Sequence, residues 1–134
     1  MKDTVNSFSV VLPAAAANTI SAILDFSPEA TGFLTNQWRT GFFKVSVPAM
    51  ANHTNTSATV KLTLQQSSVN ANANFANTDP LIEVQIAGVA STGSVAKVVK
   101  VPLNPEGKRY VRFVAAATAN ATTDGLTASF DFQA

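Results

Sequence analysis

The sequence predicts an all-β protein, an antiparallel β-sandwich of about eight strands in jelly-roll order. Apolar and polar residues alternate with a period of two in several segments, and no segment combines helical length with a 3.6-residue period. Turn residues separate the strand-like runs, as at residues 104–107 (Asn-Pro-Glu-Gly). Many short strands with some long connections are typical of two stacked antiparallel sheets. An immunoglobulin-like sandwich is the alternative, because periodicity does not specify strand order.

Eight segments have the composition of strands. The clearest alternation sets Val60, Leu62 and Leu64 against threonines and a lysine, which indicates a strand with one buried face. The predicted strands cover residues 5–12, 20–26, 41–47, 59–64, 82–86, 95–103, 109–119 and 126–132. A chain of 134 residues has the length of one domain. We therefore assign residues 1–19 to an N-terminal arm or first strand and residues 20–134 to a single jelly-roll domain.

Two kinds of connection join these strands. Residues 104–107 have the preferred residues of a type I turn, so we expect an antiparallel hairpin between segments 95–103 and 109–119. Asp124-Gly125 marks the reversal before the final strand. Residues 67–80 form a long polar connection, and loops of this length in a compact domain are usually functional or mobile.

The charge content is low and nearly balanced. Charged residues make up 13% of the chain, against about 25% in ordinary domains, and the formal net charge is +1. Neither nucleic acid nor a membrane is therefore an expected partner. No run is long enough for a membrane helix. The apolar run at residues 10–17 is interrupted by Pro13, so we interpret it as mature protein and not as an export signal.

Catalytic and metal-binding patterns are missing from the sequence. There is no cysteine, and His53 is the only histidine; it lies in a polar run and is interpreted as a solvated loop residue. The eight carboxylates are dispersed, and no G-x-S-x-G motif occurs. The glycines at residues 88–93 lack the lysine and helix of a phosphate loop. We expect a protein that is not an enzyme and that holds no cofactor and no metal.

An arginine in a predicted strand points to a contact surface. On segment 109–119, Val111 and Phe113 mark the face that meets the core, so Tyr110 and Arg112 lie on the opposite face. A guanidinium in the middle of a strand needs carboxylates, carbonyls or a partner surface. Either an intradomain partner or a subunit boundary satisfies Arg112.

The remaining aromatic residues add to this candidate surface. Trp38 is the only tryptophan and stands beside Arg39, next to a strand-like run. It fits a core or a protein interface better than a sugar-stacking platform, and Phe75 lies in the middle of the long polar connection. The predicted protein interface comprises Trp38, Arg39, Phe75, Tyr110 and Arg112.

Short motifs in the last third of the chain follow one another in a recognisable order. They are Val101-Pro102-Leu103, Tyr110-Val111-Arg112, a threonine-glycine turn at residues 122–125 and a small-residue strand at 126–130. Residues 62–67 (LTLQQS) and the alanine-rich entry at 14–20 add to the pattern. Together they resemble the small tailed-phage capsid cement, or decoration, proteins.

This resemblance implies a jelly-roll protein of the virion that binds the outer surface of the capsid and cements neighbouring capsomers. The implied partners are the major capsid protein and further copies of the chain in a homo-oligomer. We expect residues 1–19 and 66–80 to contact the capsid or a sister subunit. The alternative function is a carbohydrate-binding β-sandwich module or a receptor-binding tip.

Overall fold

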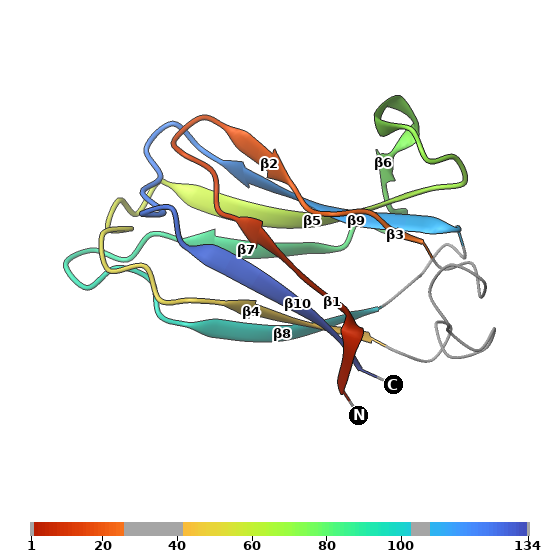
Figure 1. Cartoon of the computed structure of the whole chain (residues 1–134). Coiled ribbons are helices and arrows are strands. Elements are labelled where there is room, and N and C mark those ends of the chain that lie inside the picture. Colours follow the sequence, from red (N-terminus) through yellow and green to blue (C-terminus); the bar gives the residue numbers. More distant parts are fainter. Residues whose placement is uncertain (1, 26–41, 103–107, 134) are drawn as a thin grey trace.

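Two antiparallel sheets packed face to face make up the protein (Figure 1). A computed structural model describes residues 2–25, 42–102 and 108–133. Within these ranges there is no α-helix, and the only helical turn is the short 3₁₀ segment η1 (Asn72–Asn74). The predicted all-β sandwich is confirmed.

Each sheet combines strands from distant parts of the chain. Sheet A has the order β1 (Lys2–Val11), β10 (Thr127–Gln133), β4 (Phe42–Val47) and β8 (Lys97–Pro102). Sheet B is built on β9 (Tyr110–Ala117) and β5 (Thr59–Ser67), which pair with each other. The strands β2 (Asn18–Ile20) and β3 (Leu24–Asp25) pair with the far side of β9, and β6 (Ala76–Asn77) and β7 (Glu83–Ala87) pair with the far side of β5.

The strand order is that of a jelly roll. Because β2 and β3 occupy one edge and β6 and β7 the other, each pair acts as one interrupted strand, and the ten strands of the described residues reduce to the eight expected. The first strand, β1, neighbours the last, β10, while the second lies in the other sheet. An immunoglobulin-type sandwich places its first two strands side by side in one sheet, so this alternative is excluded.

The predicted hairpin between segments 95–103 and 109–119 is wrong. β8 pairs with β4 in sheet A, whereas β9 pairs with β5 in sheet B. The connection between them therefore crosses from one sheet to the other; its residues 103–107 lie outside the described ranges. The type I turn predicted at residues 104–107 therefore lies outside the described residues, and the long-range partner of each strand decides whether two successive strands form a hairpin.

The core lies between the sheets and is built around phenylalanines. Phe113 from β9 stacks on Phe130 from β10 with ring centres 4.2 Å apart, and so joins the two sheets. Phe8 meets Phe43 edge to face at 5.7 Å. Such aromatic pairs contribute about 0.5–1.5 kcal/mol beyond the burial of their area. The inward face predicted for β9 is confirmed, because Val111, Phe113, Ala115 and Ala117 are all buried.

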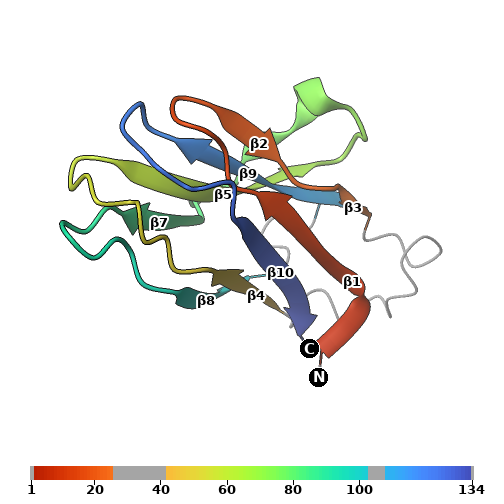
Figure 2. The ribbon, with the colours of Figure 1, turned by 60° about the vertical axis from the view of Figure 1, so that its left-hand side comes forward.

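The N-terminal segment is part of the sandwich. β1 pairs with β10 along its length, with an irregular register between Asp3 and Phe8. Lys2 pairs with Gln133, so the two ends of the chain lie side by side (Figure 2). β2 crosses the predicted boundary between residues 19 and 20. Residues 2–11 are therefore a first strand of the domain.

The interpretation of His53 as a solvated residue is wrong, because its side chain is fully buried. Its Nε2 lies 3.1 Å from the carbonyl oxygen of Ile86, and its Nδ1 accepts a hydrogen bond from the backbone of Thr122 at 3.5 Å. This pattern requires the tautomer with the proton on Nε2. The imidazole thus connects its own loop to strand β7 and to the loop that precedes β10. The polar neighbours of His53 in the chain did not indicate this role.

Candidate protein interface

Arg112 is buried on the outer side of sheet B by the loop that follows β5. Its side chain is only 6% exposed. Nε donates to Gln65 Oε1 at 2.9 Å, Nη1 donates to Asn72 Oδ1 at 3.0 Å, and the guanidinium lies over the ring of Phe75 at 4.2 Å from its centre. These partners are neutral, and burial lowers the pKa of Arg112 from its ordinary value. Arg112 therefore has partners within its own domain, one of the two possibilities expected from the sequence; the other was a subunit boundary.

The long connection after β5 is an anchored loop. The Ser67 hydroxyl donates to the Val69 carbonyl at 2.7 Å and accepts from the Val69 amide at 3.0 Å, which closes a tight turn. After η1, Phe75 is buried against Arg112, and β6 then pairs with Gln65 and Gln66. Figure 1 shows this loop rising from the outer side of sheet B. The Arg112 contacts therefore hold a projection in a defined position.

Tyr110 lies two residues from Arg112 on the same face of β9. It is half-buried, and the Arg109 guanidinium covers its ring at 5.0 Å from the centre. Arg109 also binds the Asp25 carboxylate through two hydrogen bonds of 2.8 and 2.9 Å, which ties β9 to β3. The charge of Arg109 is therefore matched locally.

The outer side of sheet B otherwise carries mostly uncharged side chains together with one ion pair. One row across the strands runs from Ile20 through Val114 and Thr63 to Glu83. Lys61 and Glu83 lie 4.0 Å apart and offset each other's charge. Ile20 is 52% exposed and Val69, in the loop, is 49% exposed. We call the outer side of sheet B together with residues 68–75 the loop face.

The structure brings together three of the five predicted interface residues. Phe75, Tyr110 and Arg112 all lie on the loop face, whereas Trp38 and Arg39 fall outside the described residues. Sequence reasoning missed Gln65 and Asn72, the two acceptors for Arg112. The signal for Gln65 was its place on the outward side of a strand, but only the register of β5 with β9 shows that it faces Arg112.

The described residues contain no cluster of three or more histidine, cysteine, aspartate or glutamate side chains that could hold a metal ion. Over the same ranges, no helix has the length and apolar character needed to traverse a lipid bilayer. Comparison with known proteins finds no family model, no curated protein and no solved structure that matches this chain.

Proposed function

We propose that this protein is a structural virion subunit that binds the outer surface of a phage capsid and cements neighbouring capsomers. The observation that carries the proposal is the loop face, where Arg112 and Phe75 hold a projecting loop against a sheet with little net charge. A surface with a fixed shape and few unpaired charges suits contact with another protein, because little ordering entropy is lost on binding. The resemblance of the last third of the chain to cement proteins supports the same function.

The proposal includes several copies of the chain acting together. Weak contacts of single copies become strong when linked copies engage a repeating surface. A closed homo-oligomer on the capsid supplies such linkage with matching symmetry. Because the ion pairs on the loop face are satisfied within the chain, we expect shell binding to change little between about 0.05 and 0.5 M salt.

Electron microscopy and co-sedimentation of purified shells with the protein test this function. The shells come from the phage whose genome carries the sequence. Regular additional density on the outer surface of the shell is the expected result. Bare shells at saturating protein concentration would exclude the proposal.

A pair of variants tests the surface itself. Val69→Asp places a charge on the loop face, and we expect it to weaken shell binding at least about tenfold, because an unpaired charge must be desolvated in the contact. Val98→Asp is the matched control, since Val98 is 60% exposed but belongs to sheet A. Equal loss with both variants would contradict the assignment to the loop face.

A glycan-binding screen distinguishes the proposed capsid-binding function from the alternative, carbohydrate binding. None of the exposed large hydrophobic side chains in the described ranges is aromatic, so those ranges support sugar stacking less well than protein contact. A clear sugar preference together with bare shells would favour the carbohydrate-binding module or receptor-binding tip.

A further inference from the structure

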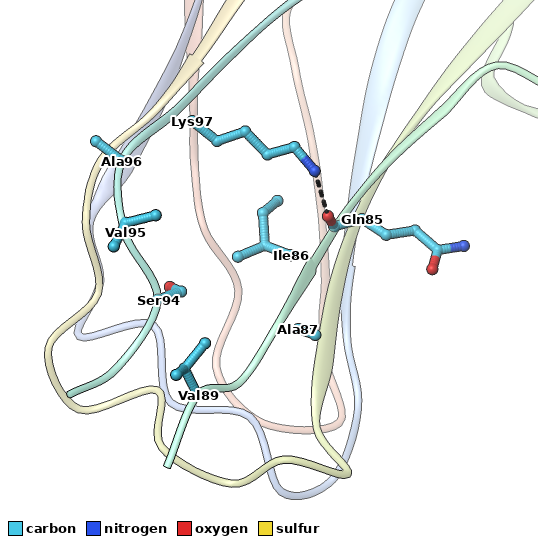
Figure 3. Close-up of a pocket in the computed structure, with 8 residues that line it drawn as sticks. All are labelled: Gln85, Ile86, Ala87, Val89, Ser94, Val95, Ala96 and Lys97. Atoms are coloured by element: carbon cyan, nitrogen blue, oxygen red, sulfur yellow. Dashed lines mark hydrogen bonds between the residues drawn. The ribbon is translucent and has the colours of Figure 1, made fainter. Parts of the chain in front are cut away.

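A cavity of about 350 Å³ opens at one side edge of the sandwich (Figure 3). It lies between β7, at the edge of sheet B, and the segment that leads into β8, at the edge of sheet A. Its size is at the lower end of the range for ligand pockets. The residues that line it are Gln85, Ile86, Ala87, Val89, Ser94, Val95, Ala96 and Lys97.

Ser94 brings a buried hydroxyl to this cavity. Its side chain is 6% exposed, and its Oγ has no hydrogen-bond partner in the part of the chain that the structure describes. Figure 3 shows the side chain between the two lining segments. Two backbone hydrogen bonds with Met50, of 2.9 and 3.1 Å, fix the position of Ser94. A buried hydroxyl without a partner is unfavourable, so a ligand that bonds to this group is favoured.

The edge of β7 adds backbone groups to the same wall. Gly88 donates to the Ala58 carbonyl at 3.0 Å, so Gly88 is a hydrogen-bonded residue of the ladder with β5. These positions alternate in an antiparallel pair, so the N–H and C=O groups of Ala87 and Gln85 point away from β5. The Lys97 ammonium, which donates to the Gln85 carbonyl at 3.0 Å, is consistent with this direction.

Lys97 is the only ionised side chain that lines the cavity. An ammonium group has three donors, and the Gln85 carbonyl takes one of them. The remaining donors lie at one end of the cavity next to Ile86, while Val95 lies on the segment that leads into β8 and Val89 at the other end. The charge and the walls together select a ligand with an anionic end next to an apolar group.

We propose that this cavity binds the C-terminal end of an extended peptide whose last residue is apolar. The peptide runs antiparallel to β7, and its penultimate residue pairs with the free backbone groups of Ala87. Its last residue then lies opposite Ile86, whose side chain points between the sheets, so the last side chain enters the cavity. The terminal carboxylate lies toward Gln85 and accepts hydrogen bonds from the Lys97 ammonium, while the Ser94 hydroxyl on the opposite wall bonds to a backbone group of the peptide. This inference does not depend on the capsid-binding proposal.

Two synthetic probes test the proposal directly. N-acetyl-valyl-leucine with a free carboxylate and the same dipeptide with a C-terminal amide are each titrated into the ¹⁵N-labelled protein. We expect saturable amide shifts at Ala87, Ser94 and Val95, and about three- to tenfold tighter binding of the free acid. No saturable shift at these positions, or equal affinity for acid and amide, would overturn the proposal.

Variants identify the groups responsible. Lys97→Gln removes the preference for the acid over the amide, while Lys100→Gln retains it, because Lys100 lies over the Phe42 ring and outside the cavity. Ser94→Ala weakens binding of the acid about threefold or more without loss of amide dispersion in the NMR spectrum. Sodium hexanoate, an apolar carboxylate without peptide groups, tests whether the site recognises a peptide or only a carboxylate next to an apolar chain. If hexanoate binds as tightly as the dipeptide acid, the peptide backbone contributes nothing to binding and the proposal fails.

Discussion

The guanidinium of Arg112 lies 4.2 Å from the centre of the Phe75 ring, although the two residues are 37 positions apart in the sequence. The contact joins the middle of β9 to the loop after β5. Stacking of arginine on an aromatic face combines dispersion with the attraction of the cation to the ring. The same guanidinium donates hydrogen bonds to the side-chain amide oxygens of Gln65 and Asn72. One side chain therefore positions the whole projecting loop.

Replacement of this arginine should therefore reduce stability. Arg112→Ala removes the donors for Gln65 and Asn72 and uncovers Phe75, so we expect the free energy of unfolding to fall by about 2–3 kcal/mol. Arg109→Ala, which breaks an exposed ion pair with Asp25, should cost less than about 1 kcal/mol. Urea denaturation of both variants measures the difference. Equal costs would show that burial of Arg112 has no energetic consequence.

A double-mutant cycle measures the coupling between Arg112 and Phe75. We combine Arg112→Met with Phe75→Leu, because both substitutions retain apolar volume. The interaction energy should be about 1–2 kcal/mol, as for a partly desolvated cation over a ring. Hydrogen exchange of the amides in residues 68–75 provides a second measurement, and protection there should fall in each single variant. A coupling near zero would indicate that the stacking is only a result of close packing.

His53 should contribute to stability, because its imidazole is buried and bonds to the backbone at two places. His53→Ala leaves the Ile86 carbonyl and the Thr122 amide without their side-chain partner and opens a cavity under the loops. We expect a loss of about 2–4 kcal/mol in the free energy of unfolding. The exposed neighbour Thr54 is the control, and Thr54→Ala should change stability by less than about 0.5 kcal/mol. An equally small effect of both substitutions would contradict the buried position of His53.

Two glycines with similar backbone angles should differ in their tolerance of a side chain. Gly93 has φ +74° and Gly125 has φ +65°, so a side chain is strained at both. A Cβ at Gly93 would lie 2.2 Å from the Met50 carbonyl oxygen, whereas nothing lies within 4 Å at Gly125. Gly125→Ala should cost about 1 kcal/mol, and Gly93→Ala clearly more. Thermal unfolding of the two variants tests this order, which equal melting temperatures would contradict.

Local sequence patterns predicted the strands and their inward faces well. The alternation around Leu62 and around Phe113 identified the buried residues, because successive side chains in a strand point to opposite sides. The turn at Asp124-Gly125 is also confirmed, since both residues have positive φ and Leu126 donates to the Thr123 carbonyl at 3.1 Å. These features depend only on neighbouring residues.

The pairing of strands and the environment of polar residues could not be predicted in this way. Gln65 and Arg112 are 47 positions apart, and Thr122 and His53 are 69 apart, so no local pattern connects them. The hairpin expected between residues 95 and 119 failed for the same reason. The cavity beside Ser94 exists only because the edges of two different sheets meet there.

The amino-acid sequence alone determined that this chain forms strands, which side of each strand is apolar and where several turns occur. The tertiary structure decided which strands became neighbours, that Arg112 and His53 are buried, and where a loop projects and an edge cavity opens. The physical reason is that backbone preference and side-chain alternation are local properties, whereas burial and hydrogen-bond partners arise from contacts between segments that are distant in the chain.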